Sequence, residues 1–154
     1  MRALNVLVLL TLFVLSSCTS KETKSTLADD LVGEWRNVYL NVTMPTVGSS
    51  DSSMTTVCDS SNWEAMLHIK PIHTFFNKDG TYRSEYYTLN DSLFRKSAGT
   101  WHVSNDTLIM NESDGVTYKL RTTIKNNLAE FDGMLDFDAD GKADDHYVGR
   151  QRKH

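Results

Sequence analysis

The sequence predicts an all-β fold: an eight-stranded antiparallel up-and-down β-barrel, with a two-sheet β-sandwich as the alternative. Three observations predict it. Pairs of turn-forming residues rich in Asn, Asp and Gly recur at short intervals between apolar segments. The segment 116–124 alternates between apolar and polar residues, and no stretch after Gly33 keeps a helical period. About eight strands joined by short connections can close on themselves and remove exposed sheet edges.

The first 17 residues have the layout of a secretory signal peptide. Arg2 supplies a positive charge, residues 3–15 are almost entirely apolar, and two serines precede Cys18. The apolar run is shorter than the roughly 20 residues that span a bilayer. Residues 15–18 read Leu-Ser-Ser-Cys, which resembles the lipobox of bacterial lipoproteins. The alternative is an ordinary signal peptide followed by an incidental cysteine.

The lipoprotein resemblance implies that Cys18 is acylated, becomes the new N-terminus and anchors the protein to a membrane of the cell envelope. Several acyl chains (palmitate, for example) on one residue make such attachment effectively permanent. Residues 18–30 are then the lipidated cysteine and a flexible tether, because the run 19–26 contains only Thr, Ser, Lys and Glu. Thr19 rather than Asp follows the cysteine, which resembles an outer-membrane address in Gram-negative bacteria.

Residues 31–154 are expected to form one domain, since they are too few for two cores. The chain has a formal net charge of −4, and loss of Arg2 with the signal peptide removes one positive charge and leaves about −5. This balance argues against nucleic-acid binding, which needs a positive surface. Cys58 has no disulfide partner once Cys18 is lipidated, and we expect it to be a structural or incidental free thiol.

The elements follow in order along the chain. Residues 27–32 can form one helical turn capped by Thr26, and the β-branched and aromatic residues of 34–42 predict the first strand. The polar stretch 46–62 is expected to be a long loop that covers the barrel mouth. Apolar residues at positions 63, 65, 67 and 69 predict another strand, which Pro71 interrupts. Further strands are expected at 73–76, 81–89, 94–103, 107–110, 116–124, 128–136 and 145–149.

Three short motifs make this chain similar to the small, lipid-anchored members of the lipocalin-like family. They are Leu31-Val32-Gly33-Glu34-Trp35 at the first strand, Phe76-Asn77-Lys78-Asp79-Gly80-Thr81-Tyr82 at a hairpin, and Gly99-Thr100-Trp101. In that family the first Trp closes one end of the barrel and an Arg from the last strand packs over it. The resemblance therefore implies a lipocalin-like barrel in which Gly33, Trp35 and Arg150 (or Arg152) have a structural role at one barrel end.

Aromatic residues on the expected strands are candidates for an apolar ligand site, because such residues are the usual lining of small-molecule cavities. Equally, a small barrel can fill itself with them as core. The candidate lining residues are Tyr39, Phe75, Tyr82, Tyr86, Trp101 and Tyr118.

An Asp-rich segment near the C-terminus has the spacing of a calcium-binding loop. Acidic residues stand at its first, third, fifth and ninth positions, and Gly141 at the sixth permits a tight turn. The candidate ligands for a structural Ca²⁺ are Asp136, Asp138, Asp140, Lys142, Asp144 and Asp145. The twelfth position, where a bidentate Glu belongs, is Tyr147. The alternative is an Asp-Gly hairpin with solvated carboxylates and no ion.

These patterns favour a lipid-anchored binding module whose barrel takes a small hydrophobic ligand. The alternative is a structural lipoprotein with a filled barrel that presents its loops to another envelope protein. We expect no enzymatic activity and no catalytic residue, since the chain has no nucleophile–base pair and no phosphate-binding Gly loop. Its histidines lie at no tight metal-ligand interval.

Overall fold

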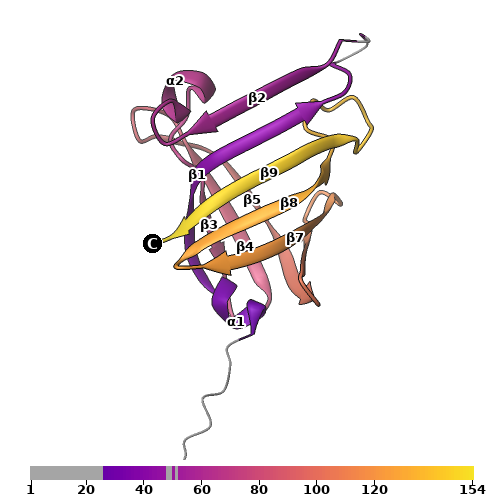
Figure 1. Cartoon of the computed structure of the whole chain (residues 1–154). Coiled ribbons are helices and arrows are strands. Elements are labelled where there is room, and N and C mark those ends of the chain that lie inside the picture. The colour runs from indigo at the N-terminus through magenta and orange to yellow at the C-terminus, as the bar shows by residue number, and fades with distance from the viewer. Residues whose placement is uncertain (1–25, 48–49, 51) are drawn as a thin grey trace, which may run out of the picture.

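The computed structural model describes residues 26–47, 50 and 52–154, so the signal peptide, Cys18 and most of the expected tether lie outside the described residues. Within these described residues, two short helices and nine strands follow one another (Figure 1). Their bounds are α1 Leu27–Leu31, β1 Gly33–Met44, β2 Met54–Asp59, α2 Trp63–Leu67, β3 His73–Phe76, β4 Thr81–Tyr87, β5 Leu93–Ser104, β6 Thr107–Glu112, β7 Thr117–Lys125, β8 Leu128–Leu135 and β9 Asp145–Lys153.

Eight antiparallel strands close into a barrel. The sheet order is β2-β1-β3-β4-β5-β6-β7-β8-β9, and an additional pairing of β1 with β9 closes it. This confirms the predicted up-and-down barrel and excludes the sandwich. The ninth strand, β2, lies outside the closed ring and pairs only with the second half of β1, from Tyr39 to Met44. The first half of β1 pairs with β3 instead.

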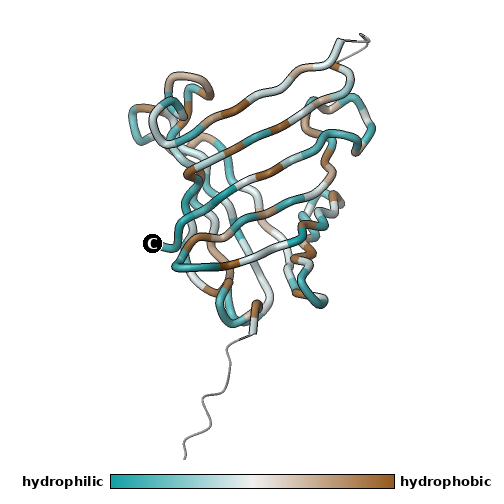
Figure 2. The backbone as a smooth tube through the Cα atoms, in the orientation of Figure 1, coloured by the Kyte–Doolittle hydropathy of each residue, from teal (hydrophilic) through white to brown (hydrophobic). Residues whose placement is uncertain are grey.

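Short turns connect most neighbouring strands, as the Asn, Asp and Gly pairs predicted. Asn105, Asn126 and Asn127 have φ of 56°, 52° and 59°, which is the left-handed conformation that these hairpins require. The strand β7 shows the expected alternation, with Tyr118, Leu120, Thr122 and Ile124 on the less exposed side. Figure 2 shows apolar and polar residues alternating along the barrel strands.

The helix α1 closes the lower end of the barrel in Figure 1. A capping box between Thr26 and Asp29 begins it, which confirms the predicted cap. Trp35 is fully buried, and its Nε1 donates a 2.6 Å hydrogen bond to the carbonyl of Leu31 at the end of the helix. The expected role of Trp35 at a barrel end therefore agrees with its position.

The cation that covers Trp35 is Lys153, so the expectation that Arg150 does this is wrong. The Nζ of Lys153 lies 5.3 Å from the centre of the Trp35 ring and donates a 2.7 Å hydrogen bond to the carbonyl of Asp30. Arg150 lies on the outer face, over the ring of Tyr39 and 2.8 Å from a carboxylate oxygen of Glu130. A β-carbon at position 33 would meet the side chain of Lys153, and the φ of +132° at Gly33 also favours glycine.

Two expected elements differ from the structure. Residues 63–67 form the helix α2 rather than a strand, because Trp63 and Leu67 are four residues apart and share one helical face. His68 ends this helix with a φ of 55°. The polar stretch 46–62 is not a simple loop, since it contains β2, in which Cys58 is fully buried.

The buried core falls into two clusters. One fills the closed end around Trp35, Phe76 and Trp101, and includes Leu108 and Phe131. The other lies under β2 and α2, where Leu40, Val42, Met44, Cys58 and Trp63 pack together. Tyr147 packs against both clusters. In the described part of the chain, no helix has the length and apolar character needed to cross a membrane.

Candidate functional site: the barrel cavity and its rim

The interior of the barrel holds a cavity of about 480 Å³, a size typical of small-molecule sites. Trp35, Phe76 and Trp101 close the barrel beneath it, and it reaches the opposite end, where Leu67, Arg95 and Phe137 line it. Its wall is mainly apolar. The lining residues are Asn37, Leu40, Trp63, Leu67, Ile69, Ile72, Thr74, Phe76, Ser84, Tyr86, Arg95, Met110, Tyr118, Leu120, Phe131, Leu135, Asp136, Phe137, Tyr147 and Gln151.

Polar side chains interrupt this apolar wall at buried positions. The amide Nε2 of Gln151 donates a 3.3 Å hydrogen bond to Oδ1 of Asn37, and both residues are buried. The hydroxyls of Thr74 and Ser84 lie 3.1 Å apart. Two lining side chains keep a buried polar atom with no hydrogen-bond partner in the described protein, namely Nε1 of Trp63 and Oε1 of Gln151. These two atoms, one donor and one acceptor, are buried within the wall itself.

Three tyrosines, Tyr86, Tyr118 and Tyr147, line the cavity. The hydroxyl of Tyr118 donates a 2.9 Å hydrogen bond to Oε2 of Glu112. Burial raises the pKa of Tyr118, and hydrogen bonding to Glu112 raises it further, so the phenol stays protonated at neutral pH. Burial also raises the pKa of Tyr86, and it raises the pKa of Tyr147 to about 12. These rings therefore act as neutral walls rather than as acids or bases.

Arg95 supplies the positive charge of the cavity wall. Its guanidinium lies 5.1 Å from the centre of the Tyr86 ring, and the residue is exposed at the mouth. Leu89, Leu93 and Phe94, in and next to the β4–β5 turn at the same end, expose 43 %, 43 % and 55 % of their surface. This part of the mouth therefore combines a cation with exposed apolar side chains.

The structure separates the six aromatic residues that were expected to line a cavity. Tyr86 and Tyr118 line it. Tyr82 and Trp101 are buried in the core cluster at the closed end, where Trp101 donates hydrogen bonds to two backbone carbonyls. Tyr39 and Phe75 lie on the outer face, under the guanidinium groups of Arg150 and Arg83, so the lining expectation is wrong for these two.

Two features of the strands explain why Tyr39 and Phe75 face outward. The register of β1 against β9 shifts between Asn37 and Tyr39, which marks a bulge in β1. Before the bulge the odd-numbered Asn37 is buried, and after it the even-numbered Leu40 is buried, so Tyr39 faces outward. In β3, Thr74 and Phe76 are buried, which places the intervening Phe75 outside. The sequence reasoning missed Asn37, Thr74, Ser84 and Gln151, which are polar residues at inward positions and carry no apolar signal.

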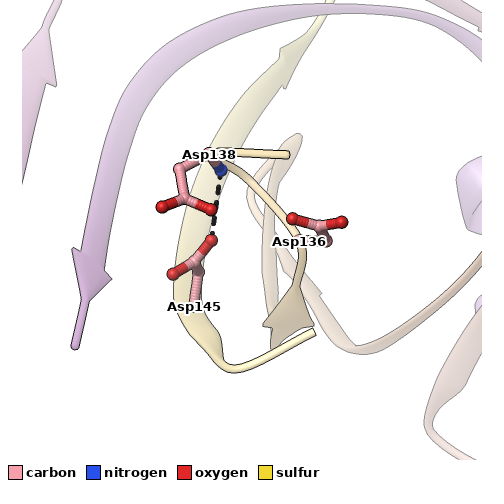
Figure 3. A group of neighbouring side chains, drawn as sticks. All are labelled: Asp136, Asp138 and Asp145. Carbon is pink, nitrogen blue, oxygen red and sulfur yellow. Dashed lines mark hydrogen bonds between the residues drawn. The ribbon is translucent and has the colours of Figure 1, made fainter. Parts of the chain in front are cut away.

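The Asp-rich loop between β8 and β9 forms part of the cavity rim, because Asp136 and Phe137 line the cavity. The carboxylates of Asp136, Asp138 and Asp145 come together, each offering an oxygen within 4.8 Å of the others (Figure 3). Asp140 instead forms an ion pair with Lys142, at 3.2 Å. Asp140, Lys142 and Asp144 are therefore not members of this group, although the sequence pattern included them.

Other reactive side chains are dispersed. Burial raises the pKa of the Cys58 thiol, and its sulfur lies 3.8 Å from that of Met66, as expected of a structural thiol. His73 lies on the outer face beside Glu34, 3.6 Å away. Over the described part of the chain, the three loop aspartates are the only group of three or more His, Cys, Asp or Glu residues with converging ligand atoms.

No protein-family model and no curated protein sequence matches this chain.

Proposed function

We propose that this protein is a lipid-anchored lipoprotein of the bacterial cell envelope whose lipocalin-like barrel binds a small, mainly apolar molecule. The observation that carries the proposal is the interior cavity of about 480 Å³ with a mostly apolar wall. A barrel of eight strands can either fill itself or hold one small ligand. Here side chains fill the closed end, and the space above it is lined but not filled.

The lining of the cavity defines the ligand further. Its mainly apolar wall favours a ligand with an apolar body. The charged lining residues are Arg95 and Asp136, and both lie at the mouth. A polar or charged end of the ligand would therefore lie at the mouth rather than deep in the barrel, where burying it would be costly.

The anchor proposal rests on the sequence of residues 1–18, which lies outside the described residues. Its geometry suits the barrel. The described chain begins at Thr26, next to α1 at the closed end, whereas the cavity opens at the other end. A tether attached at Cys18 thus leads to the closed end and leaves the mouth unobstructed. Replacement of Cys18 by Ser should abolish labelling by radioactive palmitate and release the protein from the membrane fraction.

A matched pair of variants tests ligand binding in the cavity. Met110 lines the cavity from β6, and Lys119 is exposed on β7. Met110→Trp places a large ring inside the barrel, while Lys119→Trp places the same ring outside. After incubation with a bacterial lipid extract, native mass spectrometry should detect bound small molecules on the wild type and on Lys119→Trp, and at least tenfold less on Met110→Trp. Equal uptake by all three proteins, or none by any, would contradict the proposal.

A further inference from the structure

We propose that the loop between β8 and β9 binds one calcium ion through the carboxylates of Asp136, Asp138 and Asp145. These three side chains come from the two ends of the loop. Asp136 directly follows β8, and Asp145 begins β9. In Figure 3 the carboxylates of Asp138 and Asp145 face each other, and that of Asp136 lies beside them. One oxygen from each residue lies within 4.8 Å of the other two.

One carboxylate of this group is buried and keeps an unpaired oxygen. Asp145 is only 1 % exposed. Its Oδ2 accepts hydrogen bonds from the backbone N–H groups of Phe137 and Asp138, at 2.6 Å and 3.2 Å. Its Oδ1 is buried and has no hydrogen-bond partner in the described protein. A buried carboxylate is costly unless it is paired or coordinates a metal, so this oxygen indicates a missing positive partner.

The protein does not supply that partner from the loop itself. Lys142 is the loop's only cation, and its ammonium is 3.2 Å from Oδ2 of Asp140. The pKa of Lys142 is raised by its hydrogen bond and ion pair with Asp140 first, and only weakly by Asp144 and Asp138. Three carboxylates that approach one another repel, and a bound cation converts this repulsion into attraction.

The chemistry of the ligands favours calcium. All three are hard oxygen donors, which excludes metals that prefer thiolate or imidazole. Calcium binds oxygens at about 2.3–2.6 Å in a flexible geometry, so two ligands on opposite sides of the ion lie up to about 5 Å apart. Magnesium requires near-octahedral geometry at about 2.0–2.1 Å and is less tolerant of this spacing. Water and backbone carbonyls complete the coordination of such sites.

Calcium at this place would act on the cavity mouth. Asp136 is both a proposed ligand and a lining residue of the cavity, and its neighbour Phe137 lines the cavity while exposing 44 % of its surface. An ion that ties Asp136 and Asp138 to the buried Asp145 fixes this loop to the start of β9. The proposal concerns the metal alone and does not require that the barrel bind an organic ligand.

Isothermal titration of the full-length protein with CaCl₂, together with thermal unfolding, tests the proposal. Extracellular calcium sites commonly have dissociation constants of about 0.1–1 mM, and we expect a value in that range with one ion per chain. Saturating calcium should raise the melting temperature. Magnesium at the same concentration should bind at least tenfold more weakly.

Three variants, each of which removes one negative charge from the loop, identify the ligands. Asp145→Asn and Asp136→Asn should each weaken calcium binding at least tenfold, while Asp144→Asn, outside the group, should change it less than threefold. Asp136 is exposed, so its variant tests the site even if Asp145→Asn does not fold. Absence of calcium binding up to 10 mM, or an equal loss in Asp144→Asn and Asp136→Asn, would overturn the proposal.

Discussion

Replacing the polar pair inside the barrel should stabilise the protein and at the same time weaken ligand binding. The perturbation is the double variant Asn37→Leu/Gln151→Met, which exchanges two buried polar side chains for apolar ones of similar size. Asn37 is 6 % exposed and Gln151 is 9 % exposed. Both line the cavity, so the substitutions change its chemistry without adding much volume.

The magnitude follows from the hydrogen bonds of the pair. Oε1 of Gln151 has no partner in the described protein, and such an atom costs about 1–3 kcal/mol. The bond between the two amides is 3.3 Å long, so its contribution lies at the weak end, about 0.5–1 kcal/mol. Replacing both side chains loses the hydrogen bond between them but also removes the cost of the unpaired oxygen. The double variant should therefore be more stable by about 1 kcal/mol.

Urea denaturation followed by tryptophan fluorescence measures this difference in the free energy of unfolding, and uptake from a lipid extract measures binding. The single variant Gln151→Met is the control, because it leaves Asn37 without its donor and should gain less stability. A double variant destabilised by more than about 1 kcal/mol would contradict this prediction, because the polar pair would then stabilise the fold. Stabilisation with undiminished binding would also refute it.

Three further predictions concern the surface and the core. Lys153→Met should lower the free energy of unfolding by about 2 kcal/mol and Arg150→Met by less than about 1 kcal/mol, as measured by urea denaturation. The lysine donates a charged hydrogen bond to a backbone carbonyl at the closed end, whereas the side chains of the Arg150–Glu130 pair are 42 % and 44 % exposed. The hydrogen bond from Tyr87 and two nearby cations lower the pKa of Glu85, so its stabilising effect is complete above its ordinary value and lost as the pH falls through the lowered one. The stability advantage of the wild type over Glu85→Gln should accordingly be larger at pH 6 than at pH 3; an advantage that grows on acidification would contradict this. Burial raises the pKa of Cys58, so iodoacetamide should label it at least 100-fold more slowly in the folded than in the unfolded protein, as followed by mass spectrometry.

The barrel could be predicted from the sequence because its signals are local. The hairpin turns use Asn, Asp and Gly at positions that need a positive φ, and the alternation of β7 fixes its inward face. Strands of this length with short connections pair with their neighbours. Closure of the ring between β1 and β9 depends on contacts between the two ends of the domain, and the strand count alone supported it.

The failures have local physical reasons as well. Trp63 and Leu67 satisfy both a period of two and a spacing of four, and the helix α2 uses the second. Phe75 and Phe76 are adjacent aromatic residues, so one of them must face outward whatever the phase of the strand. Lys153 rather than Arg150 covers Trp35 because the side chains of β9 alternate between the inside and the outside of the barrel. The inward side carries the buried Asp145 and Gln151, and it comprises residues 145, 147, 149, 151 and 153.

The site was predicted less well than the fold. The polar residues of the cavity wall lie at inward positions that only the three-dimensional register reveals, and Asn37 is inward because of the bulge next to it. The Asp-rich loop was visible from its spacing, but the spacing suggested Asp140 and Asp144 as ligands. Of the six candidate ligands, the structure brings together only Asp136, Asp138 and Asp145, and Asp140 pairs with Lys142.

The most direct test of the proposed function is native mass spectrometry of the full-length protein isolated from its own membrane, with no ligand added. We predict one reproducible small-molecule adduct, present in the wild type and in Lys119→Trp and absent from Met110→Trp. A bare protein mass in the wild type, or an adduct that the filled cavity of Met110→Trp still retains, would contradict it.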